Sequence, residues 1–146
     1  YFAGRTYSAI RRSGELNALS ALLESPQGQE AQNMILAQDC LWSYVPLLKQ
    51  VPTLDDSRCF IYAGIWCPTS HYVVSKFLQN RADKYNLRSL SCLRDIFRDQ
   101  YYIAAAVDNS YAAGYANRAE NTYQYVASRN LSEYGIPVYG SGPFGR

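Results

Sequence analysis

The sequence has little histidine, methionine or charge. Among its 146 residues are one His (His71) and one Met, and only 18% are charged, below the about 25% usual in soluble domains. A single His excludes His-rich metal sites and most chemistry that needs two histidines. No apolar run reaches the about 18 residues of a membrane span, and the first residues lack the apolar core of a secretory signal. These absences make an enzyme the less expected answer.

No motif supplies a catalytic centre. The glycine patterns of phosphate-binding and dinucleotide-binding loops, the nucleophile elbow of hydrolases and the H-E-x-x-H zinc motif are all missing. Asp55 and Asp56 lie in a loop at residues 51–56, where we expect them to cap the next helix rather than form an acid/base pair. His71 is expected on a helix surface. We therefore predict no catalytic residue, no metal and no cofactor.

The four cysteines leave two interpretations open. Cys40, Cys59, Cys67 and Cys92 lack the C-x-x-C spacing of zinc ribbons and thioredoxin-like sites. Their even number allows two disulfides, with three connectivities that the sequence does not separate. The alternative is four buried thiols, because Cys is among the most buried residue types. Disulfides would indicate an extracellular or virion-surface setting, or a hyperthermophile.

Hydrophobic periodicity predicts an all-α body over residues 15–133. Leucines at helical spacing predict a helix from Glu15 that Ser25-Pro26 ends. A second helix is expected over 29–48, with Pro46 kinking or ending it. The apolar run 59–67 fits either a buried strand or a buried helix, and its helical neighbours favour a helix.

The remaining pattern predicts further helices and an extended tail. Pro68 should restart the chain, with Thr69 or Ser70 as a helix N-cap. Helices are then expected over 87–107 and 110–129. Residues 134–146 contain four Gly and two Pro together with apolar side chains, so we expect an extended segment that docks on another surface.

Positive charge is concentrated in two segments. Residues 1–14 contain Arg5, Arg11 and Arg12 and no acid, and residues 76–98 carry a net charge of +4. If the second segment is helical, Arg81, Lys84 and Arg88 share one face. Because arginine binds phosphate through two parallel hydrogen bonds, all six are candidate nucleic-acid contacts. The alternative for each is an ordinary solvated surface.

Tyrosine is the most over-represented residue, with 14 copies. Tyr111, Tyr115 and Tyr123 have the spacing of an intramolecular seam. Tyr102 and Tyr125 fall off that seam, and Tyr134 and Tyr139 lie in the tail, so these four need other partners. Tyrosine and arginine with few Lys and Glu are typical of protein interfaces. The composition therefore indicates a chain that buries much of its surface against other chains.

The chain resembles the helical major coat (capsid) proteins of rod-shaped and filamentous viruses of hyperthermophilic archaea. The resemblance lies in Gly4-Arg5-Thr6 of the basic arm, in charge-poor helices such as Ala112-Ala-Gly-Tyr-Ala-Asn117, and in the tail Tyr134-Gly-Ile-Pro137. It implies an all-α coat with a helical N-terminal arm around double-stranded DNA in the A form, and a C-terminal helical bundle. In that family two paralogous coat proteins sometimes pair. The resemblance assigns Arg5, Arg11 and Arg12 to phosphate.

Two functions follow as hypotheses. The first is a virion coat subunit that assembles with copies of itself, or with a paralogous coat protein, and packages double-stranded DNA without reading its sequence. The second is a secreted or surface-exposed disulfide-bonded helical module that binds another protein. The second explains the cysteines and the sequon Asn130-Leu-Ser132 better, but it explains the basic arm and the apolar tail less well.

Overall fold

Every regular element in the part of the chain that the structure describes is helical, which confirms the all-α prediction. The computed structural model describes residues 1–131, so the extended segment predicted at 134–146 lies outside the described residues. The chain divides into two compact units, Tyr1–Asp39 and Cys40–Arg146. The boundary after Asp39 falls inside the single helix that the sequence predicts over 29–48.

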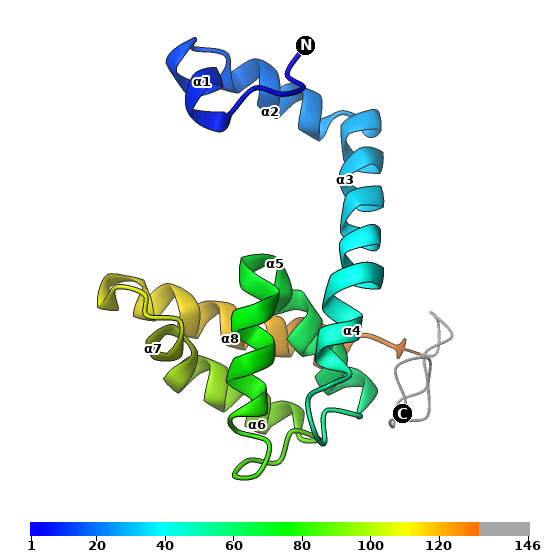
Figure 1. Cartoon of the computed structure of the whole chain (residues 1–146), viewed down its shortest axis with the longest axis vertical. Helices are drawn as coiled ribbons and strands as arrows, with labels where there is room; N and C mark the ends of the chain where they lie inside the picture. The colour runs from blue at the N-terminus through cyan, green and yellow to red at the C-terminus, as the bar shows by residue number, and fades with distance from the viewer. Residues whose placement is uncertain (132–146) are drawn as a thin grey trace. The chain divides into compact units, whose positions relative to one another are not determined.

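The first unit consists of three helices in succession (Figure 1). They are α1 (Tyr7–Arg12), α2 (Leu16–Glu24) and α3 (Pro26–Asp39). Thr6 caps α1, because its Oγ1 accepts a hydrogen bond from the N–H of Ala9 at 3.2 Å. Ser25 is extended and ends α2 as predicted. Pro26 then begins α3, three residues earlier than expected, since the fixed φ of proline suits a first helical position.

Very little of the first unit is buried. Ile10 is its one buried apolar side chain, and Gly28 is the other buried residue. A Cβ added to Gly28 would lie 2.0 Å from the carbonyl oxygen of Leu22. The backbones of α2 and α3 therefore approach so closely that only glycine fits at this position.

Pro46 changes the local helical geometry but does not end the helix. A π-helical turn, η1 (Cys40–Tyr44), comes directly before it, and Pro46 itself lies in the first turn of α4 (Val45–Leu48). Proline has no N–H to donate, and its ring would collide with the carbonyl of Trp42 in a regular α-helix. The wider π turn accommodates both effects, so the predicted disruption at Pro46 is local.

The longest helix, α5 (Ser57–Gln79), has two halves. Asp56 caps the first half and accepts hydrogen bonds from two backbone N–H groups of the first turn, both at 3.0 Å. Ser70 has φ −171° and ψ 105°, which breaks the helix, and its Oγ accepts from the N–H of Val73 at 3.4 Å. The predicted helix over 59–67, the cap before it and the restart at Ser70 are all confirmed.

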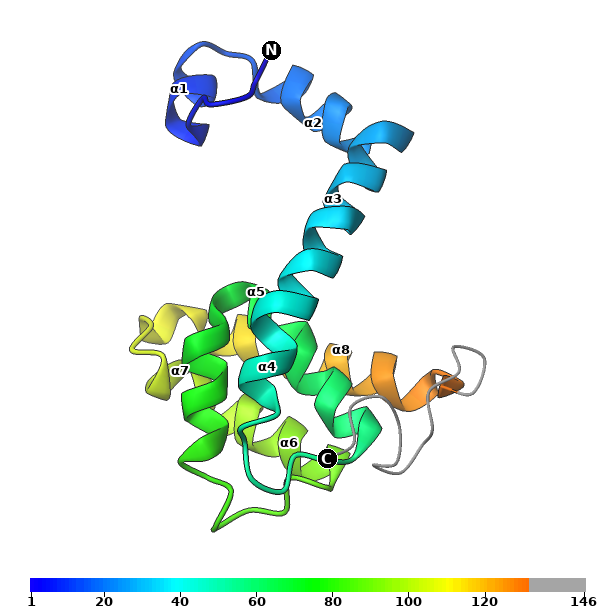
Figure 2. The ribbon, with the colours of Figure 1, turned by 45° about the vertical axis from the view of Figure 1, so that its right-hand side comes forward.

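The rest of the second unit is a series of shorter helical segments and one long helix. They are α6 (Leu90–Ile96), the π turn η2 (Phe97–Tyr101), α7 (Tyr102–Ala104), the 3-10 turn η3 (Asn109–Tyr111) and α8 (Ala112–Ser128). Ala106, with φ 54°, separates the two helices predicted over 87–107 and 110–129. Helix α8 packs against α5, α6 and η2 (Figure 2).

An aromatic cluster forms the centre of the second unit. Its members are Tyr62, Trp66, Phe77, Phe97, Tyr101 and Tyr115. The Trp66 ring lies 4.6 Å from Phe97 and 4.9 Å from Tyr101, between ring centroids. Trp66, Phe97 and Tyr101 have no exposed surface, and aromatic pairs at these separations stabilise a core beyond the area that they bury. The second unit therefore has a core of its own.

Candidate nucleic-acid interface

Of the three predicted phosphate contacts in the first unit, Arg5 already has partners. Its Nη2 lies 2.6 Å from Oε2 of Glu15, and each side chain is about a quarter exposed. Ser13 and Tyr1 also donate hydrogen bonds to the Glu15 carboxylate. The Arg5 bond, followed by those from Ser13 and Tyr1, lowers the pKa of Glu15 to about 2. Arg5 thus fastens the segments on either side of α1 to each other.

Arg11 and Arg12 are differently placed. Both lie in the last turn of α1, both are exposed, and neither side chain forms a hydrogen bond or ion pair with any residue from 1 to 131. Gly14, with φ 76°, turns the chain directly after them. Two adjacent guanidinium groups held at the end of a helix can bind phosphate without first breaking an internal contact.

The second predicted basic surface does not exist in the expected form. Helix α5 ends at Gln79 and α6 begins at Leu90, so the prediction that Arg81, Lys84 and Arg88 share a helix face is wrong. The connecting segment 80–89 is rich in Asn, Asp and Ser, whose side chains compete for backbone hydrogen bonds and favour turns.

Two of these three cations have protein partners. Arg81 donates to Oε1 of Gln100 at 3.0 Å, and its guanidinium lies 3.8 Å from the centre of the Phe77 ring. Burial lowers the pKa of Arg81. Arg88 forms two hydrogen bonds with the Asp55 carboxylate, at 2.7 and 2.8 Å. Lys84 is exposed, and its side chain has no polar contact among the described residues.

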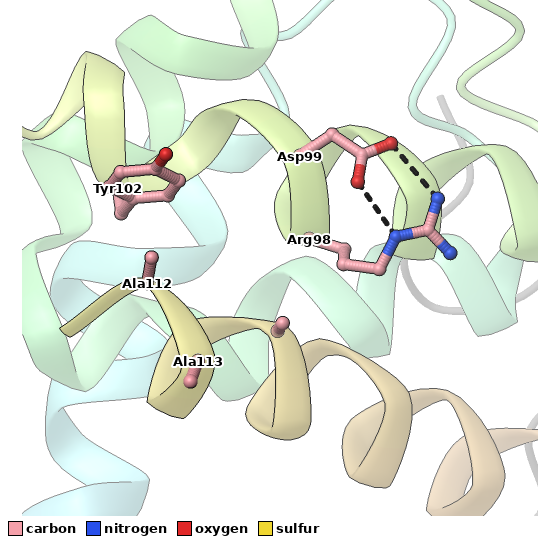
Figure 3. Close-up of a pocket in the computed structure, with 6 residues that line it drawn as sticks. Arg98, Asp99, Tyr102, Ala112 and Ala113 are labelled. Atoms are coloured by element: carbon pink, nitrogen blue, oxygen red, sulfur yellow. Dashed lines mark hydrogen bonds and ion pairs between the residues drawn. The ribbon is translucent and has the colours of Figure 1, made fainter. Parts of the chain in front are cut away.

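The other arginines of this basic segment are also compensated by acids. Arg98 binds Asp99 at 2.7 Å and Asp95 at 3.2 Å, and Arg94 binds Asp95 at 2.9 Å. Figure 3 shows the Arg98–Asp99 pair beside a surface hollow of about 430 Å³ whose other walls are alanines and a tyrosine. Because Arg98 and Asp99 bind each other, neither of the two charged residues that line this hollow is left unpaired for a ligand.

Two arginines that the sequence did not single out hold helices together. Arg58 donates to backbone carbonyls near the end of α8, among them that of Arg129 at 2.9 Å. Arg118 donates to Oγ1 of Thr69 at 2.5 Å and lies 4.2 Å from the centre of the Trp66 ring. Each contact joins residues about 50 to 70 positions apart in the sequence, so no local pattern could reveal it.

The described residues provide no cluster of side chains that could hold a metal ion. No three His, Cys, Asp or Glu side chains of residues 1–131 gather closely enough to hold a metal ion. His71 packs against the rings of Tyr44 and Tyr72, at 5.5 and 4.3 Å between centroids. Cys59 and Cys67 are buried, Cys40 and Cys92 are partly buried, and no disulfide joins any of these four described residues.

Helix α3 contains the longest run of exposed residues in the part of the chain that the structure describes. Every residue from 31 to 39 is exposed, including three consecutive apolar residues, Met34, Ile35 and Leu36. Met34 and Ile35 each retain 59% of their surface. We call Met34, Ile35 and Leu36 the α3 apolar surface. Exposed apolar surface that is contiguous and large is typical of sites where another chain binds.

The second unit has exposed apolar side chains of its own. Leu41 and Trp42 in η1 are 63% and 76% exposed. Among the tyrosines, Tyr115 and Tyr123 pack against the core as predicted, but Tyr111 is 60% exposed because it belongs to the 3-10 turn before α8. Tyr125 is 52% exposed, in agreement with its predicted place off the seam.

Comparison with known proteins gives no family for this chain. No family model, no curated protein and no solved structure matches it. Within the described residues, no helix is both long enough and apolar enough to cross a membrane.

Proposed function

We propose that this chain is a structural coat subunit that self-assembles into a helical virion and packages double-stranded DNA through sequence-independent phosphate contacts. In this proposal residues 1–14 are a basic arm and the following helices form the body of the capsid subunit. The observation that carries the proposal is the exposure of every residue of α3 from 31 to 39, with the α3 apolar surface among them.

The energetics of the first unit support assembly. With one buried apolar side chain, Ile10, these 39 residues gain little from burial. An isolated helix of this length is marginal in water, so a stable α3 requires a surface that covers it. Residues 31–38 carry no charge, and a second copy can therefore pack on them without desolvating charged groups. The proposed partners are copies of the chain, with a paralogous coat protein as a further partner.

The distribution of uncompensated charge supports binding to DNA. Arg11 and Arg12 are the exposed arginines of the first unit without a protein partner among residues 1–131, whereas Arg5 is paired with Glu15. In the second unit, Lys84 is similarly available. A few cations per subunit are sufficient when subunits repeat along a duplex, because affinity for phosphate accumulates over the contacts.

Light scattering together with the ratio of absorbance at 260 and 280 nm tests the whole proposal. We expect large particles that retain nucleic acid when the chain is produced without a second coat protein. A monodisperse monomer free of nucleic acid would contradict the coat function and support the protein-binding module instead. Assembly only after addition of a second coat protein would restrict the proposal to a paired capsid.

Substitution of the two free arginines tests the DNA contacts separately. Arg11→Ala with Arg12→Ala should lower the slope of log affinity against log salt by up to about 1.8, because each phosphate contact contributes about 0.9. Arg88→Ala is the matched control, since it removes a cation that is already bound to Asp55. Equal slopes for the double variant and the unmodified chain would exclude α1 as the DNA-binding element.

A further inference from the structure

We propose that the four cysteines form two specific disulfides, Cys40–Cys67 and Cys59–Cys92, when the chain folds in the presence of a small-molecule disulfide oxidant. The inference does not depend on the coat function. It selects one of the three connectivities that the sequence allows.

The geometry of α5 excludes a bond between Cys59 and Cys67. Both lie in the first half of this helix, before the break at Ser70. Eight residues at about 1.5 Å each separate their Cα atoms by about 12 Å, whereas a disulfide requires roughly 4.4–6.8 Å. This removes the connectivity that contains Cys59–Cys67. The same separation means that a cysteine beside one of them is not beside the other.

The beginnings of α5 and α6 bring Cys59 and Cys92 together. Each cysteine is the third residue of its helix, and its N–H donates to the capping side chain, Asp56 for Cys59 and Ser89 for Cys92. The residues just before the two caps, Asp55 and Arg88, are joined by two hydrogen bonds. The first turns of α5 and α6 therefore both begin next to the Asp55–Arg88 ion pair, and α5 packs against α6. Burial, with smaller contributions from Asp56 and Cys92, raises the pKa of Cys59.

A comparable relation brings Cys40 to Cys67. The rings of Tyr44 in η1 and His71 in α5 lie 5.5 Å apart between centroids, so η1 and the middle of α5 are in contact. The π turn η1 packs against α5, and Cys40 contacts the core cluster that contains Cys67. Burial, with a smaller contribution from Cys40, raises the pKa of Cys67 to about 12. Cys40 and Cys67 therefore lie on elements that pack against each other, as do Cys59 and Cys92.

The reaction is thiol–disulfide exchange with a small disulfide such as oxidised glutathione. The thiolate of Cys40 or Cys92 attacks one sulfur of the oxidant and releases one small thiolate. The thiolate of the buried partner then attacks the mixed disulfide and releases the second. Two cysteines are oxidised, one small disulfide is reduced to two thiols, and the two cysteine protons pass to those thiols.

Burial determines when this reaction is fast. The thiolate is the attacking species, and burial raises the pKa of Cys59 and Cys67 in the folded chain. Exchange is therefore slow after folding and fast during folding, when all four thiols are solvated. The bonds should form on refolding with oxidised glutathione, rather than on adding it to folded, reduced protein.

Peptide mapping of the full chain refolded with oxidised and reduced glutathione tests the pairing. After thiol blocking in denaturant we expect no blocked cysteine, and chymotryptic peptides linked as Cys40–Cys67 and Cys59–Cys92. Chymotrypsin is required because no Lys or Arg lies between Cys59 and Cys67, whereas Phe60, Tyr62 and Trp66 do. Four blocked cysteines, or any other linkage, would overturn the proposal.

Two double variants with the same number of thiols provide a matched test. Cys40→Ala with Cys67→Ala retains a proposed pair and should form one intramolecular disulfide. Cys40→Ala with Cys92→Ala retains Cys59 and Cys67, which lie about 12 Å apart, and should form none. Equal oxidation of both variants would refute the pairing. If either variant lost its helical circular dichroism, the linkages of the unmodified chain would decide the question.

Discussion

Two buried tyrosines of the second unit differ in the hydrogen bonding of their hydroxyl groups. The hydroxyl of Tyr62 donates to the carbonyl of Ala119 at 3.0 Å. The hydroxyl of Tyr101 is buried and has no hydrogen-bond partner among residues 1–131. A buried hydrogen bond contributes about 1 kcal/mol to stability, whereas an unsatisfied buried hydroxyl costs about 1–3 kcal/mol.

The corresponding phenylalanine variants should therefore change stability in opposite directions. We expect Tyr62→Phe to lower the free energy of unfolding by about 1 kcal/mol, and Tyr101→Phe to raise it by about 1 kcal/mol. Urea unfolding followed by circular dichroism measures both, and each variant serves as the control for the other because both keep the ring. Equal changes in the two variants would show that ring packing alone determines their contribution.

Residue-scale features were predictable from the sequence where they depend on near neighbours. Asp56 and Ser70 cap helices as their positions indicated, because a cap requires only the next three residues. The partners that the arginines bind in the folded chain were not predictable. Arg88 binds Asp55, an acid 33 positions away. In the sequence Arg88 looks available to bind phosphate, and its pairing with Asp55 becomes visible only when α5 and α6 pack together.

At the scale of elements, glycine occupies two different environments. Gly28 stands where α2 and α3 touch, and an added Cβ would lie 2.0 Å from the Leu22 carbonyl oxygen. Gly64 lies inside α5, and outside its own helix backbone an added Cβ would meet no atom of residues 1–131 within 4 Å. The first glycine is required by a close backbone approach, and the second costs helix stability without a compensating contact.

Alanine at these positions should separate the two effects. Gly28→Ala should force α2 and α3 apart and increase hydrogen exchange in residues 16–39, while the second unit remains protected. Gly64→Ala should raise the free energy of unfolding by about 1 kcal/mol, the difference in helix propensity. Unchanged exchange in Gly28→Ala would mean that the joint between α2 and α3 adapts to a methyl group.

The helices could be predicted from the sequence more completely than the breaks between them. Apolar spacing located the helix over 110–129, because burial of one face imposes a helical period. For residues 59–67 the spacing did not decide between strand and helix, and the neighbouring helices favoured a helix. Arg81, Lys84 and Arg88 were expected to share a helix face, but the structure shows residues 81–88 as turns and bends. Like charges spaced by three and four do not by themselves make a helix, and this segment has only Leu87 as a fully buried apolar residue.

For the molecule as a whole, the two units differ in how their stability can be explained. The second unit has an aromatic core with fully buried Trp66, Phe97 and Tyr101. The first has Ile10 and a close contact at Gly28. Composition predicted a chain that buries surface against others, but only the structure assigns the longest exposed run of residues 1–131 to α3. Under the proposed function, assembly supplies the burial that the first unit lacks.

Substitution on the α3 apolar surface tests this dependence on assembly. Burying Ile35 in an interface contributes about 1.5–3 kcal/mol, and a charge there would also have to be desolvated. Ile35→Asp should therefore raise the concentration needed for assembly at least about tenfold, since about 1.4 kcal/mol corresponds to a factor of ten. Gln27→Asp adds the same charge to an exposed polar position of α3 that lies outside residues 31–38 and is the control. Light scattering over a concentration series measures both variants, with circular dichroism to verify that the second unit stays folded. Assembly of Ile35→Asp at the same concentration as the unmodified chain would place the subunit interface elsewhere, and loss of assembly in both variants alike would assign the effect to charge rather than to the apolar surface.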